Sequence, residues 1–303
     1  MLFSAPKVPD DLWRLMASVG PRWLTNVPGH VKLMVDEFSN LHRTSSEDGV
    51  VVRRDISYGP HERQTFDVFS PPLVGRNRPA VLFVHGGAFV DGHRNRTPEI
   101  YSNVTRYFAR HGIVAINIGY RLAPDARYPE ATRDIAQVVT WSREHAEELG
   151  ADPGKIFLMG HSAGAAHAAS YAYDKRLHGK DGPSLAGLIV ISGRVRADNL
   201  LENPNARKVE AYYGTDASRY DDVSPASHVD AASVPTFVAW GQYENALIDV
   251  YCAELTHRLG VAKRRTPPIV WLKDHNHTSM IGHINTSEDM LGAAMRSFIE
   301  DPW

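Results

Sequence analysis

The stretch KIFLMGHSAGAA, residues 155–166, decides how this sequence is interpreted. Mostly apolar residues predict a buried strand, and the alanine-rich residues after them predict a helix. Between the two, residues 160–164 match the pattern G-x-S-x-G, with Ser162 at its centre. This pattern holds a serine on a sharp strand-to-helix turn, where its hydroxyl is exposed as a nucleophile. A tight polar turn would use the same glycines, so the partners of Ser162 decide between the two interpretations.

Strand-like and helix-like segments alternate on both sides of this stretch. Apolar and β-branched runs predict strands at residues 50–59, 63–71, 80–86, 112–120, 155–160, 185–192, 236–241 and 269–274. Helical periodicity predicts helices at residues 97–112, 129–149, 162–174, 247–260 and 288–300. Thr97 is the expected cap of the first of these helices, and Gly260 the expected end of the fourth. Repeated strand–helix units predict an α/β fold whose mostly parallel sheet is covered by helices on both faces.

The N-terminal residues have a different pattern. Residues 1–47 carry apolar side chains at helical spacing in two segments, which a turn-rich stretch separates. We therefore expect a single domain, with residues 1–47 as a helical segment and residues 48–303 as the core.

Composition excludes several classes of function. The 303 residues carry a formal net charge of −2 and no long basic run, so nucleic acid is not an expected partner. No apolar stretch has the length of a membrane span, and the N-terminus lacks the pattern of a secretory signal. With one cysteine, Cys252, the chain has no internal disulfide and no cysteine-built zinc site. We expect a cytoplasmic protein with no membrane partner and no cofactor.

A loop suited to an oxyanion hole follows the predicted strand at residues 80–86. Attack of a serine on a carbonyl creates an oxyanion, which backbone amides stabilise when no Cβ blocks their approach. Gly86 and Gly87 meet this requirement, so the amides of Gly87 and Ala88 are expected donors, and the amide of Ala163 after the serine adds another. A phosphate-binding loop is the alternative, but neither GxGxxG nor Gly-Lys-Ser/Thr is present in this loop.

A serine nucleophile needs a base, and two histidines follow the last predicted strand. His275 and His277 lie in the stretch IVWLKDHNHTSM, residues 269–280. We favour His277, deeper in the loop, as the base, and keep His275 as the alternative. Alternate residues of an extended segment face one side, so the two histidines also suit a metal. No further His, Asp or Glu cluster has ligand spacing, and we predict no metal site.

The acid that orients the base is expected after the strand at residues 236–241. Glu244 lies in the following loop, whereas Asp249 lies within the next predicted helix. A loop carboxylate can turn toward the carboxyl edge of the sheet, so Glu244 is preferred and Asp249 is the alternative. The resulting order of nucleophile, acid and base is the order that α/β-hydrolases use.

These motifs give the chain a family resemblance. It resembles the α/β-hydrolase fold, in particular the esterase and lipase branch related to hormone-sensitive lipase, whose neighbours include kynurenine formamidases and feruloyl esterase-like proteins. The resemblance runs from residue 50 to residue 299 and rests on HGGAF (85–89), GYRLAPDARYP (119–129), GHSAG (160–164), WGQYEN (240–245) and HNHTS (275–279). Ala88 stands where the lipase-like group has a third glycine, and the aromatic Phe89 follows, as in the formamidase-like pattern.

The resemblance implies an eight-stranded, mostly parallel sheet flanked by helices, with residues 1–47 as a cap over the pocket. The side chains then expected to line the pocket are Trp13, Phe89, His161 and Leu247. Arg121 and Asp134 are expected to hold loops near the site. A homodimer through an edge strand or the last helix is an expectation of the same kind.

We therefore hypothesise a serine carboxylesterase that cleaves small to medium carboxylic esters through an acyl-enzyme. An amidase or arylformamidase with the same triad is the alternative, because amide cleavage differs mainly in protonating a poorer leaving group. A non-catalytic ligand-binding protein on the same fold is disfavoured, because the nucleophile, acid and base are all present.

Overall fold

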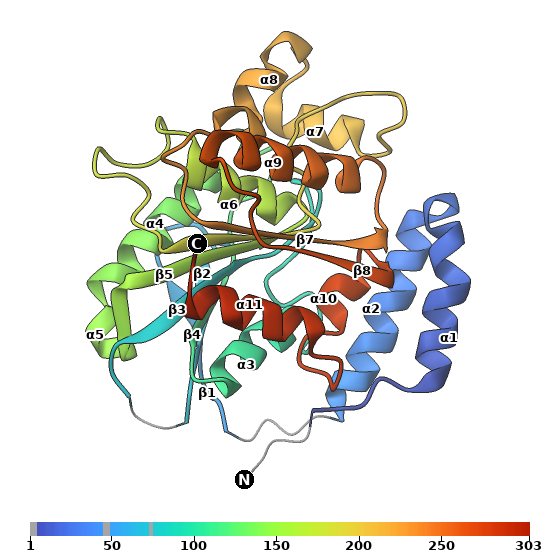
Figure 1. Cartoon of the computed structure of the whole chain (residues 1–303), viewed down its shortest axis with the longest axis horizontal. Helices are drawn as coiled ribbons and strands as arrows, with labels where there is room; N and C mark the ends of the chain where they lie inside the picture. The colour runs from blue at the N-terminus through green and yellow to red at the C-terminus, as the bar shows by residue number, and fades with distance from the viewer. Residues whose placement is uncertain (1–4, 45–48, 73–74) are drawn as a thin grey trace.

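A twisted sheet organises the computed structural model, which describes residues 5–44, 49–72 and 75–303. Its eight strands lie in the order β1-β2-β4-β3-β5-β6-β7-β8 (Figure 1). β2 pairs antiparallel with β1 and with β4, and the pairings from β4 through β8 are parallel. The strands are β1 Val51–Ser57, β2 Thr65–Ser70, β3 Arg78–Val84, β4 Val114–Ile118, β5 Ala151–His161, β6 Gly187–Ile191, β7 Thr236–Tyr243 and β8 Ile269–Asn276. The predicted eight-stranded, mostly parallel sheet is confirmed.

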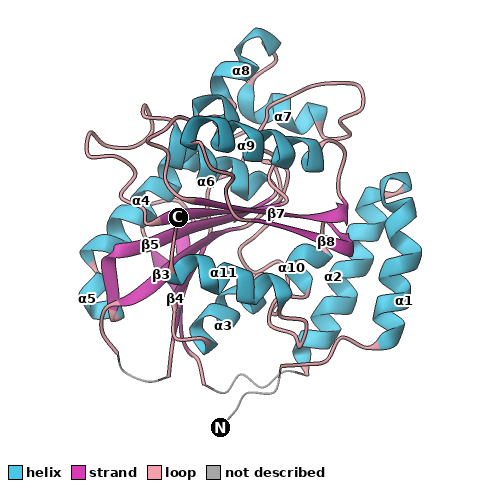
Figure 2. Cartoon of the chain, in the orientation of Figure 1, coloured by secondary structure: helices cyan, strands magenta, loops and turns pink. Residues whose placement is uncertain are grey.

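Helices cover both faces of this sheet (Figure 2). They are α1 Asp10–Val19, α2 Val27–Arg43, α3 Ser102–Arg110, α4 Glu130–Glu144, α5 Ala146–Leu149, α6 Ala163–Tyr173, α7 Ala206–Tyr213, α8 Tyr220–Val223, α9 Ile248–Lys263, α10 Ser279–Gly282 and α11 Met290–Glu300, with 3-10 turns η1 Gly20–Thr25, η2 Ala217–Arg219 and η3 Pro225–His228. α4, α6 and α9 pack on one face, and α3, α10 and α11 pack on the other. None of the described helices has the length and apolar character needed to cross a membrane.

The N-terminal helices pack on the same side of the sheet as α10 and α11. Met16 of α1, and Met34 and Phe38 of α2, are buried in the hydrophobic cluster of that face. The predicted helical character of this segment is confirmed between Asp10 and Arg43. The expected boundary between residues 47 and 48 lies outside the described residues.

Two helix ends differ from the sequence prediction. Thr97 caps only a short turn, through bonds that its hydroxyl accepts from the amides of Glu99 and Ile100. The helix α3 begins later, because Tyr101 has a φ of 76° and interrupts the chain before it. α9 continues through Gly260, since the roughly 1 kcal/mol cost of a helical glycine is small beside the burial of its apolar face. It ends at Arg264, whose φ is 57°.

The parallel arrangement positions the candidate site. β3, β5, β6, β7 and β8 are neighbours in the sheet and run in the same direction, so the loops at their carboxyl ends meet at one edge. In folds of this class, ligands bind at that edge.

Candidate active site

Ser162 lies on the turn from β5 into α6. Its φ of 57° and ψ of −122° are strained for a residue with a side chain, and nucleophile elbows use such a turn. A Cβ on Gly160 would lie 2.5 Å from the backbone of Ala165, and one on Gly164 would lie 2.2 Å from the carbonyl oxygen of Val84. Close approach therefore requires both glycines, and the motif forms an elbow with the serine at its tip.

The pairing of β7 with β8 brings Glu244 and His277 together. Tyr243 and Asn276 are partners in the register of these strands, and the amide of His277 donates to the carbonyl of Tyr243 at 3.0 Å. Glu244 follows Tyr243 and His277 follows Asn276, so these two residues leave the sheet next to each other. His277 Nδ1 lies 2.5 Å from Glu244 Oε2, and both side chains are buried.

This hydrogen bond selects one tautomer of His277. A carboxylate only accepts, so Nδ1 carries the proton and the lone pair remains on Nε2. His277 and Ser162 line the same cavity, which has a volume of about 440 Å³. A hydroxyl, an imidazole with a free lone pair and an orienting carboxylate thus lie at one site, the combination that nucleophilic acyl transfer requires.

Glu244 is held by two further donors. Ser192 Oγ donates to Glu244 Oε1 at 2.6 Å, and the amide of Gly241 donates to the same oxygen at 2.9 Å. Ser192 was not predicted from the sequence. Its position directly after β6, the neighbour of β7 in the sheet, is a signal that could have identified it. With both of its oxygens engaged, the carboxylate has a fixed orientation toward the base.

The amides expected to form the oxyanion hole border the same cavity. Gly86, Gly87 and Ala88, in the loop after β3, line it together with Ala163, the first residue of α6. The first amides of a helix have no acceptor within the helix, and they lie at the positive end of its dipole. Donors from two separate segments therefore converge beside Ser162.

Buried polar contacts hold the loop after β3. The hydroxyl of Tyr120 donates to the carbonyl of His85 at 2.7 Å, and His85 Nδ1 lies 2.8 Å from the carbonyl oxygen of Gly86. Burial lowers the pKa of His85 to about 3, so its ring stays neutral. We assign His85 to the support of the loop.

His161, directly before the nucleophile, contacts the backbone of the base. Its Nε2 lies 3.0 Å from the carbonyl oxygen of His277, and the two ring centroids are 4.7 Å apart. Burial, with a contribution from the nearby His277, lowers the pKa of His161 well below its usual value. The neutral ring therefore donates to that carbonyl and borders the cavity. It positions the segment that carries the base.

Three predicted pocket residues lie outside the lining that the described residues give this cavity. Phe89 has a φ of 72° and is buried, with its ring stacked 5.0 Å from that of Tyr212. Trp13 packs edge-on against His275, with 5.5 Å between centroids. Leu247, at the start of α9, is half-buried against the core. Each of these side chains packs against the body of the domain, and its place in a substrate pocket stays a prediction.

α2 supplies the apolar wall of the cavity in place of α1. Its residues in the lining are Val27, Pro28, Val31 and Val35. The indole Nε1 of Trp23, in η1 just before this helix, donates to Asn245 Oδ1 at 2.8 Å. The N-terminal segment is thereby bonded to the loop that carries Glu244.

The cavity lining also includes charged side chains, most of them cationic. Arg96, Arg194 and Lys208 line the cavity, together with Asp91. Arg194 is buried and pairs with Asp198 at 2.9 Å. The cavity thus combines apolar side chains of α2 with charged side chains.

The alternative acid and base lie apart from the triad. Asp249 is exposed on α9. His275 ends β8 with its Nδ1 3.1 Å from Ser279 Oγ, and its Nε2 faces Glu288. The expected pair of Arg121 and Asp134 is formed: the guanidinium of Arg121 donates to both carboxylate oxygens of Asp134.

His275 belongs to a group of potential metal ligands. His275, His283 and Glu288 each direct one ligand atom toward the others, and these atoms lie within 4.8 Å of one another. The prediction that the chain has no His, Asp or Glu cluster at ligand spacing is therefore wrong. The prediction rested on the alternation of side chains along a strand. The cluster forms instead because α10 and the loop after it bring His283 and Glu288 back toward the end of β8.

Comparisons with known proteins match the chain to a family and to known esterases. The family model described as BD-FAE matches residues 66–259. Esterase LipC of Mycobacterium tuberculosis is 28% identical over 193 residues, which are 61% of this chain and 47% of that protein. A probable isoprenylcysteine alpha-carbonyl methylesterase of Arabidopsis thaliana is 28% identical over 198 residues, which are 61% of this chain and 45% of that protein.

These matches span less than half the length of the two curated relatives. Among solved structures, an inhibited esterase B of Lactobacillus rhamnosis superposes with a TM-score of 0.71 at 18% identity. That match covers 94% of this chain and 96% of the other. The likeness to this structure is a likeness of fold.

Proposed function

The chain belongs to the BD-FAE family and has the α/β-hydrolase fold, and from this premise we propose that it is a serine carboxylesterase. It would cleave small to medium carboxylic esters. The observation that carries the proposal is the bond from His277 Nδ1 to Glu244 Oε2 in the cavity that holds the Ser162 elbow. This arrangement leaves the Nε2 lone pair of the base available for the hydroxyl proton.

The proposed reaction proceeds in two halves. Ser162 Oγ attacks the ester carbonyl while His277 Nε2 takes its proton, and the amides of Gly87, Ala88 and Ala163 hold the oxyanion. His277 then gives the proton to the departing alcohol, which leaves an acyl-enzyme. Water then loses a proton to the same nitrogen as it attacks the acyl carbonyl. His277 returns that proton to Ser162 Oγ as the bond to the acyl group breaks and the acid leaves. Glu244 keeps its charge and stabilises the imidazolium in both halves.

An ester is the favoured substrate, and an amide is the alternative. The curated relatives include an esterase and a probable methylesterase. The formamidase-like pattern of Ala88 and Phe89 supports the alternative and the finer assignment to the branch near hormone-sensitive lipase and kynurenine formamidase. Matched ester and amide substrates with the same acyl group test this choice. The ester should have the higher kcat/KM, and a higher value for the amide would assign the chain to the amidases.

The cavity favours a substrate with two unlike ends. The residues of α2 offer an apolar surface for one part of the substrate, and Arg96 and Lys208 of the same lining offer donors for a polar or anionic group. A panel of p-nitrophenyl esters of increasing acyl length, extended with a hemiester that ends in a carboxylate, tests both surfaces. We expect small to medium acyl groups to have the highest kcat/KM.

Replacement of the nucleophile tests the proposed function. Ser162→Ala should lower the turnover of p-nitrophenyl acetate and butyrate by at least roughly 10³-fold. Ser170→Ala is the matched control, because Ser170 is a buried serine of the same helix that takes no part in the site. Undiminished turnover in Ser162→Ala would exclude this mechanism.

Covalent labelling separates the enzyme from a ligand-binding protein on the same fold. A tagged fluorophosphonate should modify the wild-type chain at Ser162 and leave Ser162→Ala unlabelled. A wild-type chain that resists labelling would favour a binding protein.

The homodimer and the cytoplasmic location remain predictions. Light scattering on the eluted peak of a size-exclusion column tests the homodimer.

A further inference from the structure

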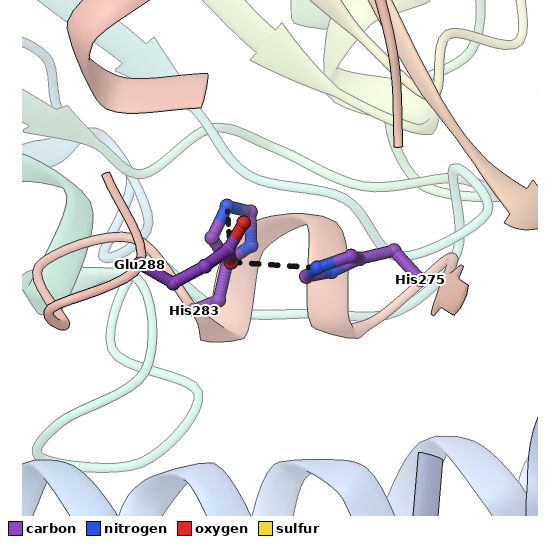
Figure 3. Close-up of side chains that lie close together, drawn as sticks. All are labelled: His275, His283 and Glu288. Carbon is purple, nitrogen blue, oxygen red and sulfur yellow. Dashed lines mark ion pairs between the residues drawn. The ribbon is translucent and has the colours of Figure 1, made fainter. Parts of the chain in front are cut away.

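Of the buried side-chain atoms that have no hydrogen-bond partner in the described part of the chain, three lie close together outside the triad. They are His275 Nε2, His283 Nε2 and Glu288 Oε2. Figure 3 shows the two imidazole rings and the carboxylate directed toward one another. Each of the two nitrogens lies 3.4 Å from Glu288 Oε2. That separation is longer than a normal N–H···O hydrogen bond, whose usual range is about 2.7–3.2 Å.

The other nitrogen of each ring determines where its proton lies. His283 Nδ1 is 2.6 Å from the carbonyl oxygen of Ser279, which only accepts, so Nδ1 carries the proton. His275 Nδ1 is 3.1 Å from Ser279 Oγ. That hydroxyl donates to the carbonyl of Asn276 at 3.1 Å, so its own proton is already used and it accepts from His275. Both Nε2 atoms therefore present lone pairs to Glu288.

Three electron-rich atoms that face one another in a buried space repel unless a cation lies among them. We propose that His275, His283 and Glu288 form a binding site for one divalent transition-metal ion, with zinc as the preferred ion. Two imidazole nitrogens and one carboxylate oxygen are a ligand set that zinc accepts. Histidine ligands of metals usually donate their other ring N–H to a backbone carbonyl or another polar group, as both rings do here.

The ligand distances agree with tetrahedral coordination. Two ligands about 2.0–2.1 Å from a tetrahedral zinc ion lie roughly 3.3–3.4 Å from each other. Both nitrogen-to-oxygen separations have this value, at 3.4 Å. The two nitrogens lie within 4.8 Å of each other, and a rotation of the rings that brings them to roughly 3.4 Å would complete the set. Glu288 is partly exposed, with 22% of its side chain accessible, and water can supply the fourth ligand from that side.

A shared proton is the competing explanation, and the geometry disfavours it. An imidazolium paired with Glu288 would form a charge-assisted bond of about 2.7–2.9 Å. Both separations exceed this range. One proton would also leave the second imidazole lone pair facing the carboxylate. A single metal ion satisfies all three atoms together.

The site would act as a structural clamp. Its three residues do not line the cavity that holds Ser162. His275 lies near the end of β8, His283 directly follows α10, and Glu288 lies just before α11. One ion would therefore hold together three parts of the chain that are connected mainly by loops. Trp13 of α1 packs against the ring of His275, which extends the clamp to the N-terminal helices.

Metal binding to the whole chain tests the proposal directly. Chelator-treated wild-type protein should bind one zinc ion per chain in calorimetric titration and should unfold at a higher temperature when zinc is present. Cobalt(II) in the same site should give the intense visible bands of tetrahedral coordination. A wild-type chain that binds no stoichiometric zinc would overturn the proposal, whatever the behaviour of its variants.

Ligand variants locate the bound ion. Glu288→Gln and His283→Gln should each weaken zinc binding by more than the roughly 10–100-fold that loss of an outer contact costs. Asp289→Asn and His111→Gln are the matched controls. Asp289 is the acidic neighbour of Glu288 and pairs with Arg296. His111 Nδ1 contacts the carbonyl oxygen of Tyr107, four residues earlier, at 2.8 Å, as His283 Nδ1 contacts that of Ser279. If Glu288→Gln binds zinc as tightly as the wild type, the ion lies elsewhere and the assignment is wrong.

The outcome is independent of the proposed function. The Ser162→Ala variant should bind zinc as the wild type does, because the nucleophile is not a ligand. The chelated wild-type protein should retain ester hydrolysis below its unfolding temperature. Failure of the metal proposal therefore leaves the esterase proposal intact, and the reverse also holds.

Discussion

Glu244 illustrates how single residues determine the chemistry of the site. Its Oε1 accepts from Ser192 Oγ and the Gly241 amide, and its Oε2 accepts from His277 Nδ1. A carboxylate held on both oxygens cannot rotate away from the imidazole. The ring therefore keeps one orientation and one tautomer, which acyl transfer to a serine requires.

Replacing this carboxylate by an amide tests its role. Glu244→Gln keeps the shape, but the Gly241 amide can only donate, so the amide oxygen takes the place of Oε1 and the NH2 group faces His277 Nδ1. The ring then accepts at Nδ1 and carries its proton on Nε2, which is the wrong tautomer. We expect kcat for p-nitrophenyl butyrate to fall by roughly 10³–10⁴-fold, with a much smaller change in KM. Asp249→Asn, the same chemical change at the exposed alternative, should keep wild-type kinetics. A larger loss in Asp249→Asn than in Glu244→Gln would reverse the assignment of the acid.

The sequence predicts the residues that carry chemistry better than the residues that support them. Ser162 follows from a motif, and Glu244 and His277 follow from their positions after strands, because neighbouring parallel strands end at one edge. Phe89 shares that kind of position, yet its ring packs on Tyr212. The direction of a side chain after a residue with positive φ depends on tertiary packing, which a local pattern does not contain.

At the scale of elements, tertiary pairing lengthens strands beyond their apolar patterns. β7 and β8 each continue past the predicted apolar run, to Tyr243 and Asn276. The added residues are mostly polar, and their strand conformation comes from pairing with each other across an irregular register. The short helix α10 was not predicted, because its four residues are too few to give a periodic signal.

β2 carries a carboxylate whose ionisation affects stability. Burial opposes the charge of Asp67, but bonds from the Asp55 amide and Asn95, with the charges of Arg94 and Arg54, outweigh it and lower its pKa. An unfolded chain has an aspartate pKa of about 3.9. As the pH falls, the unfolded state therefore takes up this proton before the folded state does, and the folded state loses relative stability.

Asp67→Asn should therefore flatten the acid limb of the stability profile. The contribution of Asp67 is complete above the unfolded pKa and is lost as the pH falls through the lower, folded pKa. Urea denaturation between about pH 6 and pH 3 should give a steeper fall in the free energy of unfolding for the wild type than for the variant. The exposed Asp249→Asn should keep the wild-type slope. Parallel curves for Asp67→Asn would contradict this account.

At the scale of the whole molecule, the N-terminal helices belong to the body of the domain. Met16, Met34 and Phe38 share one hydrophobic cluster with residues of the sheet, α3 and α11. α2 also lines the cavity, through Val31 and Val35, and Val35 belongs to the same cluster. The sequence predicts helices in this segment, but periodicity alone does not show whether their apolar stripe covers a pocket or fills a core. The structure shows that α2 does both.

A core substitution in α2 distinguishes an integral wall from a separable lid. Phe38 has no exposed surface, and its ring lies so close to α10 that a Cβ on Gly282 would approach it within 2.6 Å. Phe38→Ala should therefore lower the free energy of unfolding by about 3–5 kcal/mol, measured by urea denaturation. Leu24→Ala, on a side chain of the same segment that is 60% exposed, should change it by less than about 0.5 kcal/mol. A lid that opens freely would give the contrary result, a changed KM for the esters with little change in global stability. If α2 is part of the body, Phe38→Ala lowers stability first, and the cavity wall fails only when the domain unfolds.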